Sequence, residues 1–166
     1  MGDSITTFSE AGEGVWLNGP ANLTYTYIGK EAGSTNGFGT VSDGVFFQTA
    51  AYGGNLGTTS GSTFETTAGS AGFLDFGFVG YGTCCVAPGA IVNGLGNFGP
   101  NGGLSLAVAA ISNSSMYLML GDGYGDVDFD DMVVRVDVSA VPLPATVWLF
   151  GTALLGFIGI SRRTTV

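Results

Sequence analysis

The last 26 residues of the chain, 141–166, constrain its fold and location more than any other stretch. A Pro-x-Pro element at 142–144 precedes an uncharged, mostly apolar run at 145–161, and Arg162 and Arg163 follow directly. As a helix, the 17 residues of that run would extend roughly 25 Å, near the lower limit for crossing a bilayer core. The positive-inside rule then keeps the C-terminus in the cytoplasm and places the preceding residues outside. We expect a single C-terminal transmembrane helix; the alternative is a buried terminal helix of a soluble domain.

The same segment resembles the VPLPA variant of the PEP-CTERM sorting signal of Gram-negative bacteria. The tag residues are Val141, Pro142, Leu143, Pro144 and Ala145. The resemblance implies an exosortase as partner, a membrane cysteine peptidase that cleaves near the tag. It also implies transient anchoring in the inner membrane, with Arg162 and Arg163 as topology anchor. The body is then released to the cell surface or extracellular matrix.

Residues 1–140 form the body ahead of the tag, enough for one domain with a sizeable core. The chain contains 30 Gly, 12 Phe and 6 Tyr, which is typical of aromatic strands separated by tight turns. No segment of the body shows a helical apolar period. The predicted strands lie at 5–9, 15–17, 23–28, 45–50, 73–79, around 91, 104–108, 116–120 and 132–138. This spacing predicts an all-β fold, an antiparallel, jelly-roll-like β-sandwich of about nine strands.

Charge excludes several functions for the body. All 13 acidic residues and only two basic ones precede the tag, so the body carries a net charge of −11. Such a surface disfavours nucleic acid and attracts cations. The chain has no His, no nucleophile-elbow or Walker A motif, and no G-x-G-x-x-G placed between a strand and a helix. We expect no enzyme activity; a hydrolase using paired carboxylates is the least favoured alternative, since no such pair is indicated.

Two features concern the route of export and the state of the thiols. Residues 1–6 lack the basic start and apolar core of a signal peptide, so we expect that one lies upstream of this sequence. Cys84 and Cys85 are adjacent, and a disulfide between neighbours is strained. We interpret them as two free thiols, with an intermolecular disulfide as the alternative in an oxidising compartment.

A cluster of five carboxylates precedes the last predicted strand. Its members are Asp122, Asp126, Asp128, Asp130 and Asp131. In an extended chain, alternate members lie about 7 Å apart and repel by roughly 0.6 kcal/mol in water, or about 2.4 kcal/mol at an effective dielectric of 20. A cation should therefore lie nearby, and Arg135 is the only basic residue close in sequence.

Calcium suits this cluster, because it takes six to eight oxygen ligands and tolerates irregular loops. The spacing resembles the start of an EF-hand loop, but Asp131 stands where that loop requires Gly. The inward-facing parity changes between Phe129 and Met132, which predicts a bulge or tight turn at 130–131. The alternative to a calcium site is a solvated acidic turn that protects a sheet edge.

Residues 125–136 also resemble the C-terminal motif of an uncharacterised β-rich domain found in many PEP-CTERM proteins. That family has Asn where this chain has Asp130. Stretches 27–38 and 74–78 resemble earlier blocks of the same domain. The resemblance covers residues 14–138 at low density and implies an exported module with candidate cation ligands.

Together these features predict an exported structural protein of the cell surface or matrix, stabilised by calcium and able to self-associate through edge strands. The alternative is a calcium-dependent carbohydrate-binding module, in which Trp16, Tyr52, Tyr81 and Tyr124 would contact extracellular polysaccharide.

Overall fold

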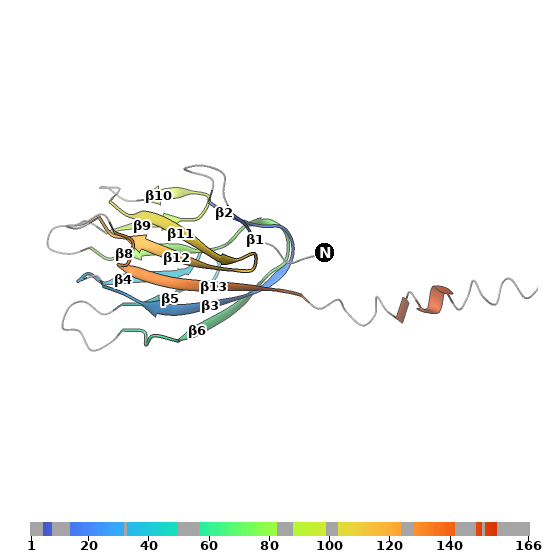
Figure 1. Cartoon of the computed structure of the whole chain (residues 1–166). Helices are drawn as coiled ribbons and strands as arrows, with labels where there is room; N and C mark the ends of the chain where they lie inside the picture. Colours follow the sequence, from blue (N-terminus) through green and yellow to red (C-terminus); the bar gives the residue numbers. More distant parts are fainter. Residues whose placement is uncertain are drawn as a thin grey trace, which may run out of the picture.

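The computed structural model describes residues 5–7, 14–31, 33–49, 57–82, 88–98, 103–123, 128–141, 149–150 and 152–155. These residues form antiparallel strands in three sheets (Figure 1). The strands are β1 (Ile5–Thr7), β2 (Val15–Leu17), β3 (Ala21–Gly29), β4 (Asn36–Thr40), β5 (Gly44–Gln48), β6 (Thr63–Ala68), β7 (Gly72–Phe73), β8 (Gly77–Gly80), β9 (Gly89–Val92), β10 (Gly96–Phe98), β11 (Ser105–Ser112), β12 (Ser115–Gly121) and β13 (Met132–Ala140).

Two five-stranded sheets pack on a common core. One, the β13 sheet, has the order β11-β12-β13-β3-β6; the other, the β8 sheet, has the order β10-β9-β8-β4-β5. A three-stranded β2 sheet, β1-β2-β7, lies at one end of the sandwich (Figure 1). The predicted antiparallel all-β class is confirmed, with more strands than the nine expected. The jelly-roll topology stays a prediction.

Alternation along the central strands creates the core. In β13, Met132, Val134 and Val136 are fully buried, whereas Arg135 and Asp137 face outward. The pattern of β3 matches it, with Tyr25 and Tyr27 inside. Period-two alternation of this kind places one face on the core and the other in solvent. The sequence alternation predicts that Tyr25 and Tyr27 share one face and that the even-numbered residues of 132–138 face inward, and the structure confirms both.

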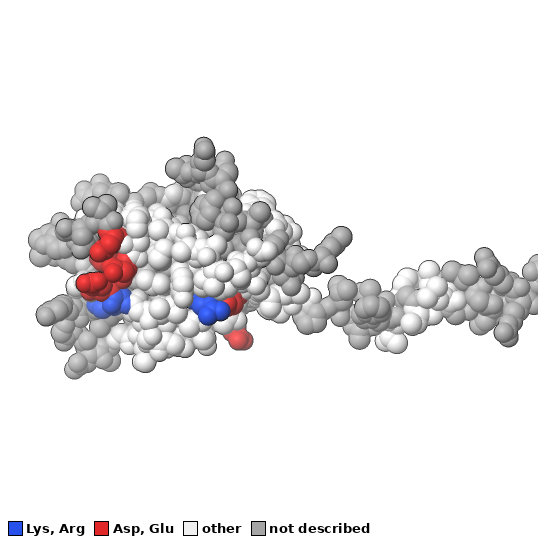
Figure 2. All heavy atoms as spheres, viewed as in Figure 1, with Lys and Arg blue, Asp and Glu red and all other residues white. Residues whose placement is uncertain are grey.

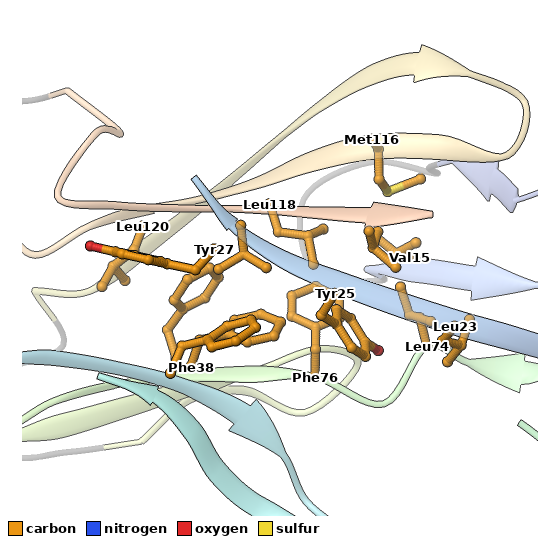
Figure 3. Close-up of a cluster of buried hydrophobic side chains, with 14 of the residues drawn as sticks. Val15, Leu23, Tyr25, Tyr27, Phe38, Leu74, Phe76, Met116, Leu118 and Leu120 are labelled. Carbon is orange, nitrogen blue, oxygen red and sulfur yellow. The ribbon is translucent and has the colours of Figure 1, made fainter. Parts of the chain in front are cut away.

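Aromatic rings fill the space between the two large sheets (Figure 3). Phe38 of β4 is central, with ring centroids 4.9 Å from Phe78 and 5.2 Å from Tyr25. The Tyr25 hydroxyl donates a 2.8 Å hydrogen bond to the Asp75 main-chain carbonyl, so that this buried polar group is satisfied. Phe46 and Phe64 stack at 3.9 Å and close the side of the sandwich between β5 and β6.

Strand β4 was not predicted, because its residues Asn-Gly-Phe-Gly-Thr show no apolar alternation. All five are nevertheless buried. The strand lies between β8 and β5, and an added Cβ on Gly39 would overlap the Gly44 carbonyl oxygen. The glycine therefore allows β5 to approach more closely than a side chain would permit. Strand β6 was also missed, since its Thr-rich sequence was not separated from the preceding loop.

The predicted strand at 73–79 is divided between two sheets. Alternation predicts that Leu74, Phe76 and Phe78 share one face, and all three are buried. However, Phe73 pairs with Trp16 in the β2 sheet, while Phe78 pairs with Phe38 in the β8 sheet. Residues 74–76 connect the two sheets while keeping the same side chains in the core.

The short apolar run of residues 116–120 favours a strand buried on both faces, and this prediction is wrong. Met116, Leu118 and Leu120 are fully buried, but Tyr117 and Met119 are only half-buried. The outer face of the β13 sheet has no covering layer there among the described residues, so the longer side chains remain partly in solvent.

Only part of the tail belongs to the described residues. Residues 149–150 and 152–155 are helical and exposed, and the Thr152 hydroxyl donates to the Leu149 carbonyl at 3.0 Å. Among the described residues, no helix has the length and apolar character needed to cross a membrane. Most of the predicted span at 145–161 lies outside the described residues, as do Cys84 and Cys85.

Candidate functional site at the carboxylate end

The predicted carboxylate cluster lies at one end of the sandwich. It occupies the connection between Gly121, the last residue of β12, and Met132, the first residue of β13. Strand β13 runs from this carboxylate end to Ala140, and its nine residues extend about 27 Å. Figure 2 shows the acidic side chains of this face gathered mainly at the end of the molecule away from the tail.

Asp122 and Asp131 are joined across the base of this loop. Both are buried, with 5% and 7% of their surface exposed. The Asp122 main-chain N–H donates a 2.6 Å hydrogen bond to Asp131 Oδ2. The Asp122 carboxylate in turn accepts a 3.4 Å hydrogen bond from Asn36 Nδ2 of β4. This pair therefore fixes the loop to the opposite sheet.

Asp128 and Asp130 lie nearer the surface, and the main chain holds their segment in place. The Asp130 carbonyl accepts a 2.9 Å hydrogen bond from the Glu31 N–H. An added Cβ on Gly121 would lie 2.6 Å from the Asp128 carbonyl oxygen, so the close return of the loop requires glycine there. The chain bends at Phe129 and Asp131, which confirms the turn predicted at 130–131.

The described carboxylates do not form a ready metal centre. Within the described ranges, no group of three or more His, Cys, Asp or Glu side chains is placed to hold an ion. Asp126, the second of the five predicted members, lies outside the described residues. The described members of the cluster thus lie in the single loop between β12 and β13, and the binding of a calcium ion by this loop stays a prediction.

One buried atom beside the pair fits an oxygen-liganded cation. Asn36 is fully buried, and its Oδ1 accepts no hydrogen bond from the described part of the chain. An unsatisfied buried acceptor costs about 1–3 kcal/mol. Asn36, Asp122 and Asp131 together offer neutral and anionic oxygens, the ligand types that calcium prefers.

Arg135 does not neutralise the cluster, contrary to the expectation from sequence proximity. Its Nη2 lies 2.6 Å from Asp137 Oδ1 on the outer face of β13, and its Nε donates to Ser115 Oγ at 3.1 Å. The hydrogen bond to Asp137 raises the pKa of Arg135. Lys30 is a basic residue that adjoins the cluster, because the N–H of its neighbour Glu31 binds the Asp130 carbonyl. The sequence does not reveal this proximity, which depends on the pairing of β3 with β13.

A second feature, the hydroxyl hollow, lies on the outer face of the β13 sheet. It has a volume of about 460 Å³ and is lined by Asn22, Leu23, Thr24, Glu65, Thr66, Thr67 and Ser139. Sequence reasoning missed it because three strands distant in sequence contribute. Of the predicted sugar-contacting aromatics, Trp16 and Tyr81 are 43% and 44% exposed, and Tyr52 and Tyr124 lie outside the described residues.

Comparison with known proteins identifies the tail. Residues 140–163 match the family model of the PEP-CTERM protein-sorting motif. No curated protein matches the sequence. The chain therefore carries an exosortase-targeting motif, which implies export and transient membrane anchoring. Val141 is exposed; Pro142–Ala145, Arg162 and Arg163 lie outside the described residues.

Proposed function

We propose that the body is a non-catalytic structural protein of the cell surface or extracellular matrix, released in folded form when exosortase cleaves near the VPLPA tag. One observation carries the proposal: the sorting motif begins at Ala140, the last residue of β13. Cleavage beyond Ala140 would leave the whole of the last strand in the body. The tag can then be removed without disturbing a strand of the sandwich.

Release is tested by expressing the full chain, with a signal peptide, in cells with and without an exosortase. With the enzyme, we expect a shortened body in the surface or medium fraction; without it, the full chain stays in the inner membrane. Replacing Pro142 and Pro144 together by Ala should prevent shortening, while Ser139→Ala, just outside the tag, should not. Full-length protein in the cytosol despite the enzyme would contradict the proposal.

We further propose that a divalent cation, with calcium favoured, stabilises the carboxylate end. The buried Asp122–Asp131 pair and the unsatisfied Asn36 Oδ1 support it. A cation there would offset the repulsion between neighbouring carboxylates and give the buried amide oxygen a partner. Asp126, Asp128 and Asp130 complete the proposed ligand set.

Self-association through β11 is the proposed route to assembly. β11 is an edge of the β13 sheet and has no charged residue over its eight positions, whereas the other edge, β6, carries Glu65. Ala109 and Ile111 of β11 are exposed. A long, uncharged edge strand offers unpaired main-chain groups to another copy.

Carbohydrate binding is the second candidate, favoured by the hydroxyl hollow. Its lining offers amide, hydroxyl and carboxylate groups from Asn22, Thr24, Thr67, Ser139 and Glu65, which suit the hydroxyls of a neutral sugar. A glycan array against the full chain, compared with Asn22→Ala and Thr24→Ala, tests it. Binding that both variants abolish would favour the carbohydrate function over a purely structural one.

A further inference from the structure

The end of the sandwich from which the sorting segment leaves displays unusual apolar side chains. On β2, Val15 and Leu17 point into the core, and Trp16 between them is 43% exposed. Its partner Phe73 is 47% exposed, and the two rings meet edge to face with centroids 5.0 Å apart. Large aromatic pairs are normally buried, so an exposed pair indicates a contact surface.

The pair extends into an apolar turn. The Asn93 side chain binds the Val15 main chain, which places the turn of residues 93–95 beside β2. This turn lies directly on the Phe73 ring, because an added Cβ on Gly94 would be 2.7 Å from it. Leu95, at the end of the turn, is 68% exposed. Trp16, Phe73 and Leu95 are thus exposed apolar residues on neighbouring segments.

Two more turns place apolar residues at the same end. Asp75, two residues after Phe73, accepts a hydrogen bond from the Val41 N–H, and Val41 is 67% exposed. Ile111, 47% exposed, is the penultimate residue of β11, and the Val138 N–H binds the Ser114 carbonyl in the turn that follows this strand. The apolar end is defined here as Trp16, Val41, Phe73, Leu95 and Ile111.

This end adjoins the start of the sorting segment. Ala140, the last residue of β13, pairs with Ala21 of β3, and only three residues separate Ala21 from Leu17 of β2. Figure 1 shows β1 and β2 at the end of the sandwich where β13 finishes. From Ala140 to the start of the uncharged run at 145, five residues reach at most roughly 17 Å. While the tail is anchored, the apolar end must therefore lie close to the bilayer.

Charge is arranged consistently with that orientation. Asp122, Asp128, Asp130 and Asp131 lie at the opposite end, at the far end of the β13 sheet. Near the tail, Asp137 pairs with Arg135, and the exposed Asp43 carboxylate, two residues after Val41, accepts a hydrogen bond from the Thr40 hydroxyl. Asp75 is held by the N–H groups of Val41 and Ser42. The strongest concentration of described carboxylates thus points away from the membrane.

We propose that the apolar end is a lipid-contact surface, on which the body rests in the headgroup region of the bilayer while the tail anchors it. The aromatic and aliphatic side chains enter the interface, where Trp and other aromatic rings are favoured. Once the tail is removed, the body is no longer tethered beside the bilayer and can dissociate from it. This inference rests on the anchoring step of the proposed function.

The experiment uses the two tryptophans of the chain, Trp16 and Trp148, in the full-length protein. The protein is reconstituted into phosphatidylcholine vesicles that contain phosphatidylcholine brominated on its acyl chains, which quenches nearby indoles. In Trp148→Phe, the remaining Trp16 should be quenched. Adding Val41→Ser and Leu95→Ser should remove that quenching, whereas Ile28→Ser, an exposed aliphatic position at the opposite end, should leave it unchanged.

The companion variant Trp16→Phe separates the possible failures. If its Trp148 is quenched while Trp16 is not, the tail is anchored and the lipid-contact surface is refuted alone. If neither is quenched, the anchoring step fails and the inference falls with it. If Trp16 is shielded from aqueous acrylamide without lipid quenching, and cross-linking gives dimers, the apolar end contacts a second copy and the proposal is overturned.

Discussion

The Asn93 side chain forms hydrogen bonds in both directions with the main chain of Val15. Its Oδ1 accepts from the Val15 N–H at 2.7 Å, and its Nδ2 donates to the Val15 and Leu74 carbonyls at 2.8 and 2.7 Å. Through these hydrogen bonds, the amide connects the β2 sheet to the turn that follows β9 of the β8 sheet.

Asn93→Ala should therefore lower the free energy of unfolding by about 2–4 kcal/mol, because it leaves buried main-chain groups without partners. Chemical denaturation monitored by circular dichroism measures the change. Asn22→Ala is the matched control: Asn22 is a half-buried amide whose hydrogen bonds lie on the outer face of the β13 sheet, and its loss should cost less than about 1 kcal/mol. Equal effects of the two substitutions would show that the bridge is unimportant.

Gly39→Ala should destabilise the protein by about 1–3 kcal/mol, because the new methyl group would overlap the Gly44 carbonyl. Gly29→Ala is the control, since nothing lies within 4 Å of a Cβ at that position. Thermal unfolding of both variants gives the comparison. A Gly39 variant as stable as the Gly29 variant would mean that β4 and β5 can separate without cost.

The buried Tyr25 predicts a loss of stability at alkaline pH. Burial raises the pKa of Tyr25 above its ordinary value of 10.0, and the nearby Asp75 and Asp43 raise it further. Burial also raises the pKa of Tyr27. Above pH 10, the unfolded chain loses these protons while the folded chain keeps them, so stability falls as pH rises.

Each such tyrosine contributes a slope of up to about 1.4 kcal/mol per pH unit in that range, and none below it. Urea denaturation at a series of alkaline pH values measures the slope. Tyr25→Phe should reduce the slope and leave the part due to Tyr27. If the slope is the same in the variant, Tyr25 ionises equally in the folded and unfolded states.

The variant Asp131→Asn separates the effect of a bound cation from the effect of the hydrogen bond that Asp131 accepts in the loop. In Asp131→Asn, the side-chain oxygen can still accept from the Asp122 N–H, but the charge is gone. We expect calcium to raise the melting temperature of the natural chain relative to chelator by several degrees, and this shift to vanish in Asp131→Asn.

Asp137→Asn, at the other end of β13, is the charge-matched control and should keep the calcium shift. A natural chain that melts at the same temperature with calcium and with chelator would reduce the cluster to a solvated acidic loop. If Asp131→Asn keeps the full calcium-dependent shift in melting temperature, calcium binds at a different site.

Ala109→Lys should prevent self-association without unfolding the body. The residue is exposed on β11, and a charge on an edge strand disfavours pairing with a second copy. Light scattering against concentration detects the assembly. Thr63→Lys, on the β6 edge, is the control and should assemble like the natural chain; the reverse pattern would assign the interface to β6.

The strands that could be predicted are those with strict alternation. The faces of β3 and β13 follow from their sequences because every second side chain is large and apolar. Strand β4 could not be found, since its burial depends on Gly39 meeting a neighbour that only the folded sheet supplies. The change of sheet within 73–79 could not be predicted either. Alternation indicates which side chains face the core, but it does not indicate with which strand each residue pairs.

The candidate site shows the same limit. The carboxylate loop was recognisable from its composition, and its turn at Asp131 from the parity of the following strand. The part played by Asn36 was not, because 86 residues separate it from Asp122. Arg135 is the basic residue closest to the cluster in sequence, but its guanidinium forms its ion pair with Asp137 instead.

The central position of β13 links completion of the fold to delivery. This strand pairs with β12 on one side and β3 on the other, and it is the last strand of the body. A chain interrupted before it would lack both the middle of its largest sheet and the sorting segment that follows. Incomplete molecules would therefore be neither stably folded nor recognised for processing, so that the order of elements along the polypeptide itself acts as quality control.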